Sequence, residues 1–430
     1  MTGLTRLTTA LALGTGNIAR VAAYRIGLRA GLHPVLKIAA AAPSGQFFAA
    51  RPSRPPPGAV ARQDWRDTGR WFGAHEFPAA APPDWHVSPF TGGRAEAGLS
   101  WHRIADFDPA LGDIKAVWEA SRFDWLLAMA QRAALGDRAD LDRLNAWLGD
   151  WSAANPPYRG VNWKCGQEAS IRVLHLALAA VLLDQAEKPL PALTALVRLH
   201  LARIAPTMGY AIGQANNHAT SEAAALFVGG SWLGRADGAR WARTGRRQLE
   251  RQALRLIAAD GTFSQYSLVY HRVMLDTHCL AESWRRRRGL SPFGEACLDR
   301  LRAATLWLQQ LTDPGSGDGP NFGANDGARL MALTDTGFRD FRPTLQWAAA
   351  LFLDRRAIAP EGPWDQLLRW LGIVSPKEPL DPPASMTFDD GGLHVLRAGR
   401  AAVYLRYPHF RFRPSQADAL HLDLWVDGDN

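Results

Sequence analysis

A long run of amphipathic helical segments constrains this chain more than any other feature. From residue 113 to about residue 357, apolar residues recur every three or four positions, and Ile171, Leu174 and Leu178 form one such stripe. The predicted helices span 113–134, 138–152, 166–185, 189–205, 216–232, 236–258, 267–288, 293–311 and 343–354. Because short loops join them, we expect antiparallel helical hairpins, which can be arranged as a toroid, a solenoid or a bundle.

Short strands follow the helices. After Pro376, the segments 385–389, 392–397, 401–406 and 419–426 are short, and apolar and polar residues alternate in 420–425, as in a half-buried antiparallel strand. Asp427-Gly428 is a strong hairpin-turn signal. The returning strand would begin near Asn430, so we expect the chain to be a fragment whose β-domain is incomplete.

The N-terminal part differs from both regions. Residues 18–32 resemble a basic amphipathic helix, and the prolines of 42–60 predict an extended linker. Residues 61–112 are rich in Trp, Gly and Pro and are expected to be irregular, with a few short strands. We therefore divide the chain into an N-terminal basic helix with a Pro-rich linker (1–60), a helical substrate domain (61–376) and the first strands of a β-domain (377–430).

Composition narrows the possible partners. The net charge of +8 and the pI of about 9.7 favour a polyanion: nucleic acid, anionic lipid or acidic polysaccharide. No nucleic-acid-binding motif is present, and the run 285–288 of four arginines is typical of a solvated helix end. Three cysteines without a CxxC pair give no disulfide framework and no zinc site. The sequence has no run of 18 apolar residues, so it predicts no transmembrane helix.

Two clusters in the helical region combine tryptophan with charge. Trp118 and Arg122 share one face of a helix, and Trp163 precedes a helix on which Glu168 and Arg172 are four positions apart and can pair. Each cluster has two interpretations: a structural ion pair beside a core tryptophan, or a wall of a sugar-binding site in which an arginine clamps a carboxylate.

A third cluster crowds the start of an otherwise apolar helix. Asn216, Asn217, His218 and Glu222 lie within two turns, and Asn217 is a plausible N-cap. Because capping requires only one of these residues, we favour a functional interpretation of the cluster.

Two loops complete the candidates. The Asp-Gly turn at 260–261 leads through Gln265 to Tyr270 and His271, a pair that can handle protons. The loop 323–327 contains Asn325 and Asp326, but it lacks the acidic residues of a calcium loop and the Lys-Ser/Thr of a phosphate loop.

In this order, the clusters resemble the heparinase II/III family of polysaccharide lyases over roughly residues 110–430. The resemblance implies a mainly α fold followed by β, that is, an incomplete α/α toroid with the start of an antiparallel β-sandwich. It also implies cleavage of a uronic-acid polysaccharide, such as a heparan-type glycosaminoglycan or alginate, by β-elimination.

The resemblance assigns catalytic roles. Asn217, assisted by His218, would neutralise the uronate carboxylate, and Tyr270 would take the C5 proton, protonate the leaving oxygen, or do both. A neighbouring cation, His271 or Arg272, would lower the pKa of the phenol. A histidine of the β-domain would complete the site, with His421 favoured over His409. The residues expected to bind substrate are Trp118, Arg122, Trp163, Glu168, Arg172, Glu222, Gln265, Asn325 and Asp326.

The expected partner is an acidic polysaccharide. The elimination requires no cofactor, although the family's β-domain can hold a structural divalent metal. Relatives often act in the periplasm, so we expect a periplasmic or cell-envelope location, or a cytoplasmic one because no clear signal peptide is present. The oligomeric state is left open. Two alternatives keep the substrate but change the outcome: a uronate C5-epimerase, and a non-catalytic polysaccharide-binding or export factor.

Overall fold

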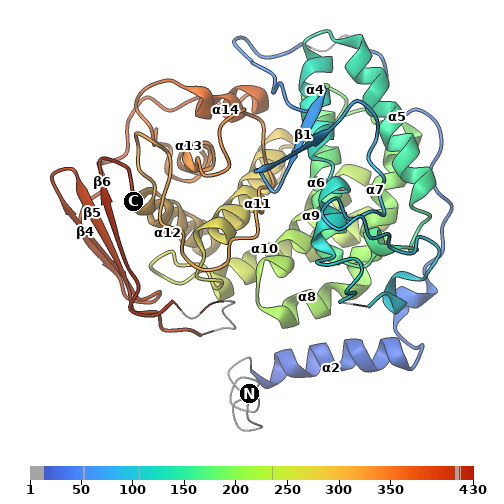
Figure 1. The fold of residues 1–430 in the computed structure, drawn as a ribbon, viewed down its shortest axis with the longest axis horizontal. Helices are drawn as coiled ribbons and strands as arrows, with labels where there is room; N and C mark the ends of the chain where they lie inside the picture. The colour runs from blue at the N-terminus through green and yellow to red at the C-terminus, as the bar shows by residue number, and fades with distance from the viewer. Residues whose placement is uncertain (1–13, 52–53, 106, 235, 412–415, 417) are drawn as a thin grey trace. The chain divides into compact units, whose positions relative to one another are not determined.

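The computed structural model describes residues 14–51, 54–105, 107–234, 236–411, 416 and 418–430. They form two compact units (Figure 1). The first unit comprises Met1–Arg20, Ile212–Thr220 and Arg247–Asn430, and the second comprises Val21–Ala211 and Ser221–Arg246. The predicted domain division at residues 60 and 376 stays a prediction.

The second unit is mostly helical. Its elements are η1 (Pro34–Lys37), β1 (Thr68–Trp71), β2 (His75–Pro78), η2 (Trp101–Arg103), α3 (Lys115–Ala120), α4 (Asp124–Ala134), α5 (Arg138–Ala154), η3 (Val161–Trp163), α6 (Gly166–Leu182), α7 (Pro191–Ile204) and η4 (Ala205–Thr207). The short strands β1 and β2 pair antiparallel within the region expected to be irregular.

The first unit joins helices to a small sheet. Its elements are α11 (Leu268–Arg287), α12 (Glu295–Leu311), α13 (Arg342–Ala348), the π-helix η5 (Ala349–Leu353), η6 (Pro363–Asp365), α14 (Gln366–Leu371), β3 (Met386–Phe388), β4 (Leu393–Ala398), β5 (Ala401–Arg406) and β6 (Leu422–Val426). Four helices have residues in both units: α2 (Thr15–Arg29), α8 (Met208–Gln214), α9 (Asn217–Leu233) and α10 (Ala236–Leu256).

Most predicted helices are confirmed to within a few residues, but 113–134 is not one helix. Phe123 has a φ of 68° and separates α3 from α4. Its ring is fully buried and packs edge-on against Trp125 and Trp151. Burial of this aromatic ring therefore outweighs continuation of the helix, although the apolar pattern runs through the break. Two short helices, α8 and α14, were not predicted.

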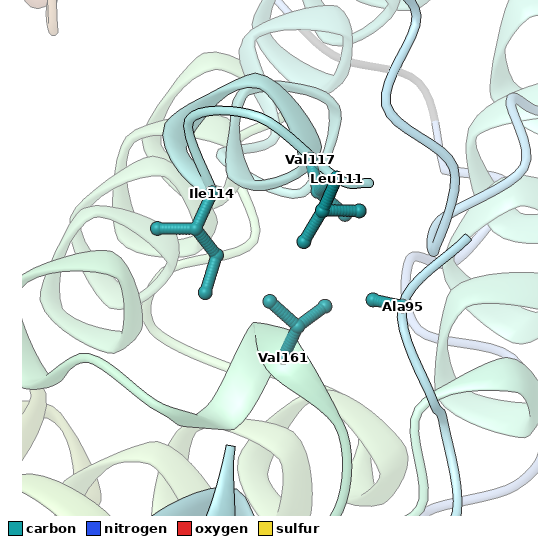
Figure 2. Close-up of a cluster of buried hydrophobic side chains, with 5 residues drawn as sticks. All are labelled: Ala95, Leu111, Ile114, Val117 and Val161. Carbon is teal, nitrogen blue, oxygen red and sulfur yellow. The ribbon is translucent and has the colours of Figure 1, made fainter. Parts of the chain in front are cut away.

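Small apolar side chains hold the irregular N-terminal segment against the helices of the second unit. Figure 2 shows the buried side chains of one cluster: Ala95, Leu111, Ile114, Val117 and Val161. Trp118 packs against this cluster from α3 and donates a hydrogen bond from its indole nitrogen to the Val161 carbonyl (2.9 Å). The cluster thereby fixes the segment that precedes α3.

The strands β3, β4, β5 and β6 form one antiparallel sheet in chain order (orange to red in Figure 1). In β6, the alternation is confirmed, but the buried face is the one that carries Asp423 and Trp425, while Leu422 and Leu424 are exposed. Trp425 donates to Asp423, so the polar side chain has a partner on the buried face.

The predicted turn after β6 is confirmed. Asp427 and Gly428 have φ values of 56° and 83°, as in a type I′ turn, and the Val426 amide donates to the Asp429 carbonyl (2.8 Å). None of the helices in the described part of the chain combines the length and apolar character that a membrane span requires.

Candidate active site

The loop between α10 and α11 is fastened to the corner between α8 and α9. The side-chain oxygen of Gln265 accepts a hydrogen bond from the Asn217 backbone amide (2.8 Å), and the Ser264 hydroxyl donates to the Ala215 carbonyl (3.4 Å). Gln265, predicted to bind substrate, thus positions the start of α9. All four residues belong to the first unit.

The cap of α9 is Asn216 and not Asn217. The side-chain oxygen of Asn216 accepts a hydrogen bond from the His218 amide (3.1 Å), which is the geometry of a capping residue. The Asn217 side chain forms no hydrogen bond with any residue that the structure describes, although Asn217 is only 5% exposed. Its amide is therefore available for a ligand, whereas the Asn216 side chain has a structural role.

Tyr270 lies in the first turn of α11, and its hydroxyl has a carboxylate partner. Ser267 caps this helix by accepting a hydrogen bond from the Tyr270 amide (3.2 Å). The Tyr270 hydroxyl donates to Oδ2 of Asp326 (2.7 Å). The prediction that Asp326 binds substrate stays a prediction; its observed side-chain partner is the Tyr270 hydroxyl. Asn217 and Tyr270 are thus attached to the same short loop, through Gln265 and Ser267 respectively.

The glycine-rich loop 323–327 holds Asp326 in place. Gly323 has a φ of 66°, and a side chain there would clash with the Tyr266 carbonyl. The Ser267 hydroxyl donates to the Ala324 carbonyl (2.6 Å). Asn325 is exposed and donates to Asn321 (2.9 Å), so its observed contact shapes the loop. Gly323 therefore allows the loop 323–327 to lie close to the loop that contains Tyr266.

The expected cation beside Tyr270 is not His271. Its ring is buried, stacks on Trp307 and contacts the Ala304 carbonyl through Nε2 (2.9 Å). Burial lowers the pKa of His271 to about 4, so it is neutral at pH 7.

Arg272 is also committed elsewhere. Its guanidinium group donates to the carbonyls of Phe338 (2.5 Å) and Ala328 (3.0 Å) and lies over the rings of Phe338 and Phe341. Burial lowers the pKa of Arg272 to about 9, the first of several causes. His271 and Arg272 follow Tyr270 directly in the sequence but point away from its phenol, because successive residues of a helix face different directions.

Two histidines of the C-terminal region have contacts with residues next to the candidate loops. The Tyr266 hydroxyl donates to the His409 carbonyl (3.1 Å) and accepts from the Arg411 amide (2.9 Å), so this segment is attached beside Ser267. His421 is exposed and lies edge-on to Phe322, with ring centroids 5.8 Å apart. Between His409 and His421, residues 412–415 and 417 lie outside the described residues.

A pocket of about 430 Å³ opens beside the loop 262–266. Tyr266 lines it together with Arg255, Arg300, Arg411 and Asp390, so three of its four charged side chains are positive. Neither Asn217 nor Tyr270 lines this pocket. Its excess of positive charge favours an anionic ligand.

In the second unit, Arg122 and Glu168 form a buried ion pair. The guanidinium group binds both carboxylate oxygens of Glu168 (2.8 and 2.9 Å) and also Glu119 (2.5 Å). The side chains of Arg122 and Glu168 are 13% and 3% exposed. This bidentate geometry accounts for both residues as structural.

The pair that was considered between Glu168 and Arg172 does not form. Arg172 is fully buried, donates to Nε2 of His200 (2.8 Å) and lies over the rings of Trp151 and Trp163. Burial lowers the pKa of Arg172 to about 9. Trp163 is 1% exposed, so it offers no surface on which a sugar ring could stack. The interpretation as core residues therefore describes Arg172 and Trp163 better than a sugar clamp.

Glu222 is buried in the same unit. Its carboxylate lies against Gly166, the first residue of α6, where any side chain would clash with it. A negative charge is favourable at a helix N-terminus, so this position is explained by packing and the helix dipole. Among the described residues, no three His, Cys, Asp or Glu side chains are grouped as metal ligands would be.

Comparison with known proteins gives a fold. No family profile and no curated protein sequence matches this chain. A crystal structure of heparinase III matches with a TM-score of 0.58 and 14% identity, covering 97% of this chain and 65% of that one. Another heparinase III matches with a TM-score of 0.51 and 17% identity, covering 77% of this chain and 52% of that one. The chain has a heparinase III-like fold. It spans about half to two thirds of the length of these structures.

The heparinase III-like fold confirms the predicted fold class, mainly α followed by antiparallel β. The predicted resemblance to the heparinase II/III family is likewise confirmed at the level of the fold. Two features of the site were missed. The Tyr270–Asp326 hydrogen bond joins residues 56 positions apart, and Arg411 reaches Tyr266 across 145 positions. For the Tyr270–Asp326 contact, the sequence signal was the Gly-Ala-Asn-Asp-Gly loop, whose glycines allow a close approach.

Proposed function

We propose that this protein is a polysaccharide lyase that cleaves a uronic-acid-containing acidic polysaccharide by β-elimination. The observation that carries the proposal is the Tyr270–Asp326 hydrogen bond, together with Asn217, which is attached to the same loop and whose side-chain amide has no hydrogen-bond partner among the described residues. A phenol paired with a carboxylate can exchange protons, and an amide without a protein partner can bind a carboxylate. The heparinase III-like fold supports the same reaction class.

The proton transfers balance within this pair of residues. The Tyr270 oxygen takes the C5 proton while its own phenol proton passes to Asp326, and the C5 electron pair moves into the uronate carboxyl group. The electrons then form the C4–C5 double bond as the C4–O bond breaks. The leaving oxygen receives a proton from Tyr270, which Asp326 reprotonates. Both residues return to their starting state, so no external acid or base is consumed.

Asn217 acts on the carboxylate. When C5 loses its proton, negative charge accumulates on the carboxyl oxygens. A hydrogen bond from the Asn217 amide stabilises this charge more strongly in the transition state than in the bound substrate. His218 follows Asn217 on α9 and assists it. A histidine of the C-terminal region, His421 or His409, contacts the substrate from the side of the sheet.

The test is a substrate panel. Purified protein is incubated with heparan-type chains, unsulfated glucuronate polymers and alginate, and ultraviolet absorbance of an unsaturated uronate is recorded. We expect this absorbance with at least one polymer. New reducing ends without absorbance would identify a hydrolase, and deuterium incorporation into intact polymer would identify a C5-epimerase. Binding with no chemical change to any polymer would refute catalysis.

A further inference from the structure

A second pocket of about 430 Å³ lies in the first unit, and none of the candidate catalytic residues lines it. It is formed by the N-terminal end of α2, the end of α10 and Ile212. Its polar lining residues are Asn17, Arg20, Gln248, Arg251, Gln252 and Arg255. Neither Tyr270 nor Asn217 contributes to it. The proposed proton transfers therefore involve no residue that lines this pocket.

The charge of this pocket is uncompensated. Three arginines line it and no acidic residue does. Within the described part of the chain, no carboxylate is close enough to form an ion pair with any of the three arginines; Arg20 contacts Asn17 and Arg255 contacts the Ile212 carbonyl. Burial and the neighbouring charge of Arg20 lower the pKa of Arg255. Crowded like charges destabilise the empty pocket, and an anionic ligand would relieve the repulsion.

Gln252 gives a second, independent indication of a ligand. The residue is only 3% exposed, and its side-chain oxygen is buried without a hydrogen-bond partner among the described residues. Its side-chain nitrogen donates to Gln248 (3.3 Å). A buried acceptor without a donor is unfavourable, and a ligand hydroxyl would satisfy it. The pocket thus presents donors for an anion and an acceptor for a hydroxyl side by side.

We propose that this pocket binds an anionic sugar unit, with its carboxylate or sulfate on the arginines and a hydroxyl on Gln252. The choice of a sugar rests on the proposed function. Arg255 also lines the pocket beside Tyr266, so the two pockets meet at one side chain. A chain of acidic sugars can therefore occupy both, and the second pocket would hold a unit remote from the bond that is cleaved.

The test compares two charge reversals on the same helix. Arg251 lines the pocket and Arg247 does not, although both are exposed and lie one turn apart on α10. Arg251→Glu and Arg247→Glu are each made in Tyr270→Phe protein, in which the ligand is not consumed. Binding of uronate oligosaccharides is measured by calorimetry. We expect Arg251→Glu to weaken binding about tenfold and Arg247→Glu less than about twofold, since only the former loses a charge-assisted hydrogen bond.

Gln252→Leu tests the hydroxyl contact. We expect weaker binding of the oligosaccharide together with unchanged or higher thermal stability, because the variant removes an unsatisfied buried acceptor. Two oligosaccharides of equal length distinguish sulfate from carboxylate as the bound group: one of sulfated sugars without carboxylates, and one of unsulfated uronates. A neutral oligosaccharide should not bind measurably through this pocket.

Three results would overturn the proposal: equal effects of Arg251→Glu and Arg247→Glu, binding that Gln252→Leu leaves unchanged, or inorganic sulfate that binds as tightly as the oligosaccharide. The lyase proposal fails separately. If wild-type protein yields no unsaturated product but binds the oligosaccharide through Arg251, the pocket stands and the catalytic proposal falls.

Discussion

The phenol of Tyr270 donates a hydrogen bond to the carboxylate of Asp326 over 2.7 Å. The loop 323–327 brings the carboxylate there, and Gly323 allows the necessary close approach to Tyr266. A carboxylate in this position receives the phenol proton as the phenol oxygen takes another. In the proposed mechanism the pair acts as a proton relay, in place of the cation that was expected beside Tyr270.

Asp326→Asn should lower kcat about a hundredfold while the protein stays folded, because the amide can accept the hydrogen bond but cannot take the proton. The residual rate should rise with pH, since hydroxide then removes the phenol proton. The measurement is the pH dependence of kcat from absorbance. Asp389→Asn is the matched control, because Asp389 accepts from the Tyr407 hydroxyl (3.1 Å) in a similar pair. Equal rates and parallel pH profiles for both variants would refute the relay.

Asn217→Ala should reduce kcat by about a hundredfold or more, as expected when one donor to a developing negative charge is removed. Asn216→Ala should instead lower stability by about 1 kcal/mol through loss of the α9 cap, with little change in kcat. Steady-state kinetics and thermal melting of both variants separate the two roles. A kinetic defect in Asn216→Ala that equals that of Asn217→Ala would show that Asn217 acts only through the helix.

Glu168→Gln should destabilise the protein by about 2 kcal/mol, because Arg122 loses two charge-assisted hydrogen bonds in a buried position but keeps Glu119 as a partner. KM should not change if the pair is structural. Asp142→Asn is the control: it breaks the exposed pair with Arg138 and should change stability by less than about 0.5 kcal/mol. A raised KM with unchanged stability would restore Glu168 to the substrate site. Urea unfolding and kinetics provide both numbers.

His271 should make the protein acid-sensitive. Its pKa falls from 6.5 in the unfolded chain to about 4 in the folded protein. Between these values the unfolded chain binds a proton that the folded protein does not, so stability is full above pH 6.5 and falls as the pH decreases toward 4. At pH 5 the loss is about 2 kcal/mol from this residue.

Asp276 changes stability with pH in the opposite direction, because burial raises its pKa to about 6. A variant is therefore needed to isolate the contribution of His271. His271→Gln places an amide near Nε2 but has no titrating group. Its loss of stability between pH 7 and pH 5 should be smaller than that of the wild type by about 2 kcal/mol. Identical losses in urea unfolding would contradict the burial of a neutral His271.

The fold was largely predictable because it follows from local patterns. Spacing of apolar residues placed α5, α6 and α11 to within a few residues, and Asp427-Gly428 predicted a turn whose two positive φ values the structure confirms. The break at Phe123 was not predictable, since it depends on packing of that ring against Trp151, which is distant in the sequence. Likewise, alternation in β6 predicted a strand but not which face is buried.

Sequence reasoning selected candidate residues but not the contacts between them. Asn217, Tyr270 and Asp326 were all candidates, and their roles stay predictions, but the pairing of Tyr270 with Asp326 requires two loops to meet. The ion pair expected within α6 instead links Glu168 to Arg122, because burial of Arg172 between two tryptophans removes it from the helix surface. Spacing within one helix predicts which residues can pair; tertiary packing decides which do.

The central claim is that Tyr270 transfers the protons of a β-elimination. It is tested most directly by comparing Tyr270→Phe with Tyr407→Phe, which removes a hydroxyl that also donates to an aspartate but belongs to none of the candidate catalytic residues and keeps the ring that contacts His409. Both are assayed by absorbance of the unsaturated product on the polymer that the wild type cleaves. We predict that Tyr270→Phe forms no measurable product while it still binds polymer, and that Tyr407→Phe matches the wild type. Product formation by Tyr270→Phe at the wild-type rate would contradict the account.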